Sequence, residues 1–156
     1  MPTITRVQVP GTKTPVGHYS QAVVANGLVF VSGQTPSDLR AGTHLTGSIE
    51  EQTERSLLNV KDILEAAGSG LEHAVQMTIF ISRIEDWGPV NATYARIMGA
   101  ARPTRAIVPV APLHYGTGIE IQCIAILPPK RKPAARVTRR KSTARRAPAT
   151  KRRPRR

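Results

Sequence analysis

Several features that would narrow the function of this 156-residue chain are scarce or absent. A single cysteine, Cys123, excludes an intramolecular disulfide and a cysteine-based zinc site within one chain, and it suits a reducing compartment. No apolar run reaches the roughly 18–20 residues that span a bilayer. The first residues lack the charged segment followed by an apolar segment that marks a secretory signal. We therefore expect a soluble, cytoplasmic protein without a transmembrane segment.

The common motifs of cofactor and metal chemistry are also missing. The sequence has no glycine-rich dinucleotide motif, no P-loop, no paired-histidine zinc motif and no nucleophile elbow. Its four histidines, at positions 18, 44, 73 and 114, are scattered without metal-ligand spacing. The histidine pattern therefore gives no indication of a metal site.

Acidic residues are absent from one part of the chain only. Residues 128–156 contain 14 Lys and Arg but no Asp or Glu. Residues 1–127 contain the other nine basic residues and all ten acidic ones, so their formal charge is −1. The basic segment consists almost wholly of Arg, Lys, Pro, Ala, Thr and Ser, which cannot bury enough apolar surface to offset the entropy of ordering. We predict a folded domain over 1–127 and a disordered polycationic tail over 128–156.

The folded part shows the patterns of an α+β domain. Ser48 and Glu51 fit a capping box, and the apolar stripe that follows predicts a helix to Ala67. A second helix is predicted over 86–98. Strands are predicted at 4–9, 22–24, 28–31, 74–82, 105–110 and 119–127, with Asn26-Gly27 as a hairpin turn between the second and third. Two helices cover only one face of such a sheet, yet 119–127 is apolar on nearly both faces, so we expect self-association to cover the other.

Two charged residues stand out in this pattern. Glu120 lies within the most apolar predicted strand, where a carboxylate is unfavourable unless a partner satisfies it. Arg105 opens the preceding strand. We expect the two strands to be neighbours, so Arg105 and Glu120 could pair with each other, or they could face one cleft in which the guanidinium grips a ligand carboxylate through two N–H bonds. A backbone hydrogen bond for Glu120 and a solvated strand end for Arg105 are the remaining alternatives.

The stretch PTRAIVPVAPLHYGTGIEI (103–121) resembles the signature of the RidA family, the reactive intermediate/imine deaminases. Residues 17–36, 50–68 and 90–99 resemble the hairpin and the two helices of that family, so the resemblance covers about 15–127. It implies a chorismate-mutase-like mixed sheet with two helices on one face, assembled as a homotrimer with active sites between subunits. It also implies a hydrolase that converts 2-imino acids, such as 2-iminopropanoate and 2-iminobutanoate, to 2-oxo acids and ammonia without metal or organic cofactor.

The resemblance assigns roles to individual positions. It makes Arg105 the group that binds the substrate carboxylate, and it places Glu120 beside the attacking water. The other substrate-binding positions are Tyr19, Ser32, Gly33, Asn91 and Ile107. Ile107 stands where many members have a cysteine, and its backbone N–H could still serve.

The basic segment leaves several interpretations open. It could lack a function, bind an anionic membrane surface, or bind DNA or RNA by releasing counterions from phosphates. It has no aromatic residue, so stacking on bases is not expected. The alternative function for the whole chain is a nucleic-acid-associated protein whose RidA-like trimer presents basic tails. The resemblance implies that such a protein is a ribonuclease or a ligand-binding regulator. Such a protein could associate with the nucleoid.

Overall fold

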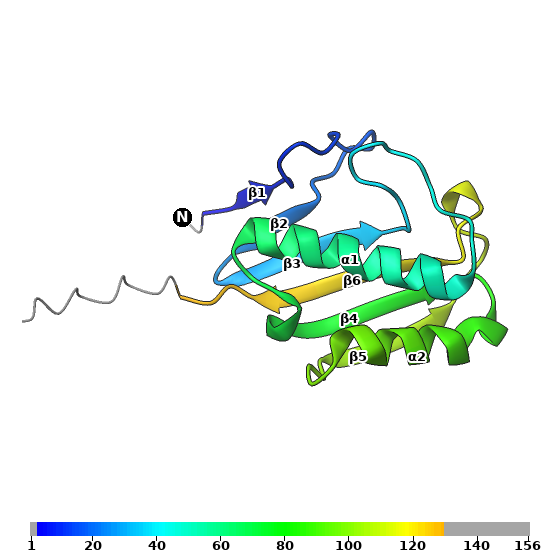
Figure 1. The fold of residues 1–156 in the computed structure, drawn as a ribbon. Coiled ribbons are helices and arrows are strands. Elements are labelled where there is room, and N and C mark those ends of the chain that lie inside the picture. The colour runs from blue at the N-terminus through cyan, green and yellow to red at the C-terminus, as the bar shows by residue number, and fades with distance from the viewer. Residues whose placement is uncertain (1–2, 130–156) are drawn as a thin grey trace, which may run out of the picture.

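The computed structural model describes residues 3–129, which form six strands, two α-helices and three short 3-10 helices (Figure 1). The strands are β1 (Thr5–Val7), β2 (Ala22–Ala25), β3 (Leu28–Gln34), β4 (Ala74–Ile81), β5 (Thr104–Pro109) and β6 (Ile119–Ile126). The α-helices are α1 (Ile49–Ala67) and α2 (Trp87–Met98). The predicted tail over 128–156 lies outside the described residues, apart from Pro128 and Pro129.

The strands form one mixed sheet in the order β1-β2-β3-β6-β4-β5. Neighbouring strands are antiparallel except for β4 and β5, which run parallel. Both α-helices lie on the same face of the sheet (Figure 1). This arrangement confirms the predicted α+β fold with two helices on one face. None of the described helices is long and apolar enough to cross a membrane.

Helix α1 begins and ends as its sequence predicts. The Ser48 hydroxyl accepts a hydrogen bond from the Glu51 N–H, and the Glu51 carboxylate accepts one from the Ser48 N–H, which completes the capping box. Gly68 follows the last turn with φ of 87°, the left-handed conformation that glycine adopts without steric cost. The apolar stripe between these ends packs on the sheet, where Leu57 and Val60 are fully buried.

The hairpin of β2 and β3 turns at the predicted dipeptide. Asn26 and Gly27 both have positive φ, 49° and 75°. This is the geometry of a two-residue turn whose twist matches that of the flanking strands. The hairpin is thereby fixed in register, with Ala25 opposite Leu28.

The two faces of the sheet differ in burial. Side chains on the helix side, such as Met77 and Ile79 of β4, are completely buried. Along β6, buried side chains on the helix side alternate with half-buried or exposed ones on the other side, so one chain does not supply the cover predicted for the second face of 119–127. Large apolar side chains remain exposed there, including Phe30 at 41% and Ile126 at 47%. One chain therefore leaves an apolar sheet face uncovered.

Candidate functional site

A β-bulge brings the Glu120 carboxylate against the backbone of Gly33. The register between β3 and β6 shifts between Val31 and Gln34, so β3 accommodates one extra residue. Such bulges bend a strand and redirect its side chains. A Cβ atom on Gly33 would overlap Oε1 of Glu120, so only glycine leaves room for the carboxylate in this position. The bulge and the glycine together fix where Glu120 lies.

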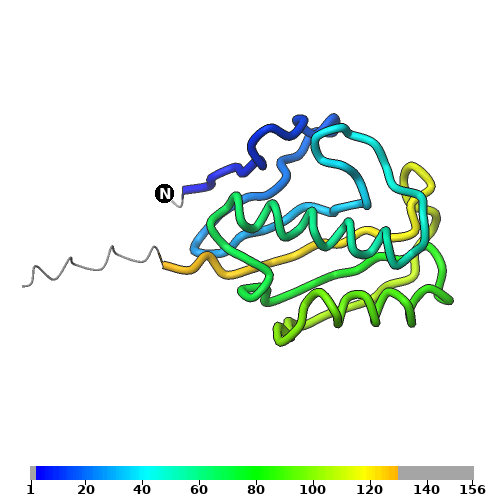
Figure 2. Tube along the Cα trace, viewed as in Figure 1, coloured from blue at the N-terminus to red at the C-terminus, as the bar shows by residue number. Residues whose placement is uncertain are grey.

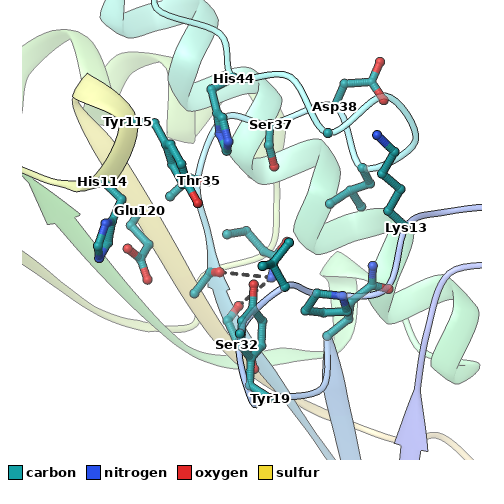
Figure 3. A pocket seen from close by; sticks show the side chains of 18 of the residues that line it. Lys13, Tyr19, Ser32, Thr35, Ser37, Asp38, His44, His114, Tyr115 and Glu120 are labelled. Atoms are coloured by element: carbon teal, nitrogen blue, oxygen red, sulfur yellow. Dashed lines mark hydrogen bonds between the residues drawn. The ribbon is translucent and has the colours of Figure 1, made fainter.

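Glu120 borders a cleft of about 660 Å³ (Figure 3). Ser32 and Gly33 of β3 and Tyr19, from the loop before β2, line the same cleft. The Ser32 hydroxyl donates a hydrogen bond to the Ser20 carbonyl over 2.7 Å, whereas Tyr19 is 56% exposed. Within residues 3–129 the half-buried Glu120 has no hydrogen bond or ion pair, so the carboxylate is available to a ligand or water. Four predicted site residues thus meet at one cleft.

Two loops that are distant in sequence meet at the rim of this cleft. The loop between β3 and α1 lies beside the loop before β6 (Figure 2). Their contact is a stack of the His44 and Tyr115 rings, with centroids 3.7 Å apart and planes 10° from parallel. Tyr115 has φ of 62°, in the left-handed region. The sequence alone singles out neither residue, since His44 has no metal-ligand spacing and Tyr115 belongs to no periodic pattern.

Arg105 lies outside that cleft, on the edge strand β5. Its Nη2 atom donates a hydrogen bond of 2.9 Å to Oδ1 of Asn91, and its Cζ atom lies 4.6 Å from the centroid of the Tyr94 ring. Arg105 and Tyr94 line a second cleft of about 390 Å³. Among residues 3–129 no carboxylate pairs with Arg105. The helix α2 therefore holds the guanidinium in place but leaves its charge without an acidic partner.

Arg105 and Glu120 do not lie on neighbouring strands, so that prediction is wrong. Strand β4 separates them: Arg105 is opposite Met77, and Glu120 is opposite Phe80. Because side chains alternate between the two faces, Arg105 shares the face of the buried Met77, whereas Glu120 shares the face of Phe80. Two residues on opposite faces form neither an ion pair nor a shared cleft in one chain. Arg105 with Asn91, and Glu120 with Tyr19 and Ser32, are two separate groups.

Burial raises the pKa of two side chains, one on α2 and one on β6. Desolvation raises the pKa of Tyr94, against an opposing effect of the nearby Arg105 charge. Desolvation also raises the pKa of Cys123 to about 12. Cys123 is 2% exposed, so it is a buried thiol. The predicted position Ile107 likewise packs its side chain against the core.

Within residues 3–129, no group of three His, Cys, Asp or Glu side chains is arranged to hold a metal ion. The polar groups that the clefts offer are carboxylate, guanidinium, amide, hydroxyl and imidazole. Such groups bind small anions and transfer protons.

Comparison with known proteins identifies the family. The family model described as Endoribonuclease L-PSP matches residues 11–127. The chain belongs to this family, which includes the RutC and RidA proteins. A RutC family protein of Pyrococcus horikoshii is 39% identical over 111 residues, which cover 71% of this chain and 88% of the relative.

Further L-PSP family relatives resemble the chain over most of its length. A 2-iminobutanoate/2-iminopropanoate deaminase of Rattus norvegicus is 36% identical over 131 residues, 83% of this chain and 96% of the relative. The crystal structure of Escherichia coli TdcF with bound serine has a TM-score of 0.73 and 31% identity, covering 78% of this chain and 98% of that one. The comparisons therefore support a deaminase-type family.

Proposed function

We propose that the chain catalyses the hydrolytic deamination of 2-imino acids, such as 2-iminopropanoate and 2-iminobutanoate, at a site shared by two copies. The observation that carries the proposal is the complementary pair of groups on opposite faces. One group offers a guanidinium without a carboxylate partner, and the other offers a carboxylate without a cationic partner, among residues 3–129. A relative named as such a deaminase, and a TdcF structure with bound serine, support small carboxylate-bearing substrates.

Arg105 binds the substrate carboxylate. The hydrogen bond to Asn91 and the contact with the Tyr94 ring fix the orientation of the guanidinium before substrate arrives. Its remaining N–H groups form a planar fork that matches the two carboxylate oxygens. Preorganisation of this kind places the imine carbon at a defined distance from the attacking group, which accounts for much of the acceleration that an already reactive imine needs.

Glu120 acts on the attacking water. Its carboxylate accepts a hydrogen bond from the water and takes a proton as the oxygen bonds to the imine carbon. The electron pair of the C=N bond moves to nitrogen, which takes the proton that Glu120 removed from the water and gives a carbinolamine. Glu120 then relays the hydroxyl proton to the amine as the C–N bond breaks, so ammonia leaves and the hydroxyl oxygen becomes the carbonyl of the 2-oxo acid. Tyr19 and Ser32 border the cleft in which this occurs.

A second copy brings the two groups together. Since the groups are different surfaces of one chain, each copy presents Arg105 to one neighbour and Glu120 to another. Such head-to-tail association gives a closed ring when the rotation between successive copies adds up to a full turn. The exposed apolar sheet face, with Phe30 and Ile126, supplies surface for that contact. The RidA resemblance implies three copies, and we adopt the homotrimer as part of the proposal.

Substitution of Arg105 tests the assignment. We expect Arg105→Ala to abolish deamination of 2-iminopropanoate with the fold intact, because the side chain is exposed and is not part of the core. Arg105→Lys recovers little activity, because one ammonium does not reproduce the fork. Arg83→Ala is the matched control, because the Arg83 side chain is exposed and its Nε atom forms a salt bridge of 3.7 Å with Oε2 of the exposed Glu85. Ammonia release is measured together with circular dichroism, and full activity in Arg105→Ala would refute the assignment.

A second candidate function concerns residues 128–156. Their 14 basic and no acidic residues favour binding of DNA or RNA through phosphates, without sequence preference. The full chain then retards DNA at about 50 mM salt and loses most of that binding at about 200 mM, whereas 1–127 does not retard it at either concentration. Equal retardation by both proteins would assign the binding to the folded domain, and none by either would exclude it. Comparing imine hydrolysis in the same two proteins shows whether the functions are independent.

A further inference from the structure

The cleft beside Glu120 is larger than the simplest imino acid requires. Its volume of about 660 Å³ lies in the range of roughly 300–1,000 Å³ typical of sites for drug-sized ligands. The groups proposed for catalysis occupy one part of its lining. Tyr115, His44 and Leu39 belong to the remainder. This second part of the lining has no role in the steps described above.

Tyr115 is held there in a conformation that a bulky residue rarely adopts. Its φ and ψ are 62° and 17°, in the left-handed region. Its side chain is 66% exposed, whereas the core tyrosine Tyr94 is only 7% exposed. Unfavourable backbone geometry of this kind persists when the surrounding structure enforces it, and it is concentrated at ligand sites. An exposed aromatic ring in a strained turn therefore indicates a contact with a ligand.

His44 fixes the orientation of that ring. The two rings are stacked 3.7 Å apart and nearly parallel, so His44 covers one face of Tyr115. His44 is itself half-buried, and its Nδ1 atom is buried without a hydrogen-bond partner among residues 3–129. The His114 ring lies tilted beside Tyr115, with centroids 5.9 Å apart, and the Tyr115 side chain is still 66% exposed. Figure 3 shows Tyr115, His114 and Glu120 along the same side of the cleft. The stack thus presents a rigid aromatic surface near the proposed reaction centre.

We infer that His44 and Tyr115 form a side-chain subsite that selects 2-imino acids with planar aromatic side chains. The inference rests on the proposed deaminase function and assigns the pair a role in specificity, not in the chemical step. A substrate ring packs against the open part of Tyr115, offset or edge-on, while its carboxylate reaches Arg105 of the neighbouring copy. An imine with a methyl side chain gains nothing from this surface.

The test compares 2-imino-3-phenylpropanoate with 2-iminopropanoate, each generated in place from the amino acid by an amino-acid oxidase. The variant is Tyr115→Asn, because asparagine tolerates positive φ and removes the ring without adding strain. We expect the ratio of kcat/KM for the aromatic imine over the methyl imine to fall about fivefold or more. Tyr115→Phe keeps the ratio within about twofold, since the ring remains. Trp87→Ala, which removes an exposed aromatic that lines neither cleft, also keeps it.

The ratio separates a subsite from a general disturbance. A displaced loop that misplaces Glu120 slows both substrates equally, so an unchanged ratio in Tyr115→Asn overturns the inference. Binding of the two products, 2-oxo-3-phenylpropanoate and 2-oxopropanoate, is measured by calorimetry on the same full-length proteins. If the wild type hydrolyses neither imine, the proposed function fails. The subsite then stands only if the wild type prefers the aromatic oxo acid and Tyr115→Asn loses that preference, and equal binding overturns it.

Discussion

The place of Glu120 depends on what its neighbour lacks. Gly33 has no side chain, and the carboxylate occupies the volume that a Cβ would fill. Gly33 does not have a positive φ, so a left-handed backbone is not the reason for glycine here. The reason is the close approach of the Glu120 carboxylate. A methyl group here therefore acts on the carboxylate more than on the fold.

Gly33→Ala tests that dependence. The new methyl displaces the end of a flexible side chain, so we expect imine hydrolysis to fall more than about tenfold. The free energy of unfolding changes by less than about 1 kcal/mol, since no backbone atom is among the nearest contacts. Gly88→Ala in α2 is the matched control: its Cβ meets nothing within 4 Å, and the change stabilises the helix by about 0.5–1 kcal/mol. Wild-type activity in Gly33→Ala would contradict the role given to Glu120.

Cys123 gives a prediction on pH. Burial raises its pKa from 9.0 to about 12, so the folded protein keeps the neutral thiol where the unfolded chain forms a thiolate. The contribution to stability is present below pH 9 and is lost as pH rises from about 9 to 12. We expect the free energy of unfolding of Cys123→Ala to depend less on pH in that window than that of the wild type. Chemical denaturation at a series of pH values measures it. Iodoacetamide labels Cys123 in denaturant at pH 8 but not in the native protein, and rapid native labelling would count against burial.

Among the elements, α1 has the most complete local signals. Its capping box contributes two hydrogen bonds at the first turn. Ser48→Ala removes one of them, and we expect a loss of about 1 kcal/mol of stability, or a Tm about 4 °C lower. Ser48→Thr keeps a hydroxyl and loses less. Thermal unfolding followed by circular dichroism distinguishes the two, and equal Tm values for Ala and the wild type would show that the cap is not needed.

The sequence predicts those parts of the fold that depend on local signals. Helix α1 and strand β4 are set by local periodicity and by residues at their ends, and both appear where the pattern places them. Strand order is not local. β6, last in sequence, inserts between β3 and β4, and nothing in the alternation of 119–127 specifies its neighbours. The error over Arg105 and Glu120 follows from assuming that consecutive strands are adjacent.

The candidate site also has a part that the sequence predicts and a part that it does not. Tyr19, Ser32 and Gly33 were identified through the RidA resemblance, and the structure groups them around Glu120. The stack of His44 and Tyr115 joins loops some 70 positions apart, a contact that no periodicity encodes. The one signal that the sequence offers for Tyr115 is its position directly before Gly116, in the turn that leads into β6.

At the scale of the whole molecule, the separation of Arg105 from Glu120 makes the proposed activity depend on an assembly. We expect Arg105→Ala and Glu120→Gln to be inactive when each is assembled alone. When the two variants are unfolded together and refolded in equal amounts, a site between an intact Arg105 and an intact Glu120 forms at about a quarter of the interfaces. We expect that fraction of wild-type imine hydrolysis. No recovery in mixed assemblies, verified by mass spectrometry, would place both groups in one chain's site.

The end of the described chain has a practical consequence. The Leu127 N–H donates a hydrogen bond of 2.8 Å to the Gly27 carbonyl, which ties the end of β6 to the hairpin turn. Glu120 lies at the opposite end of β6, roughly 20 Å away along the strand. A fluorophore, resin or fusion partner joined after Leu127 is thus rooted on the far rim of the sheet. The C-terminal side is the natural handle for immobilising this protein while its cleft remains open to substrate.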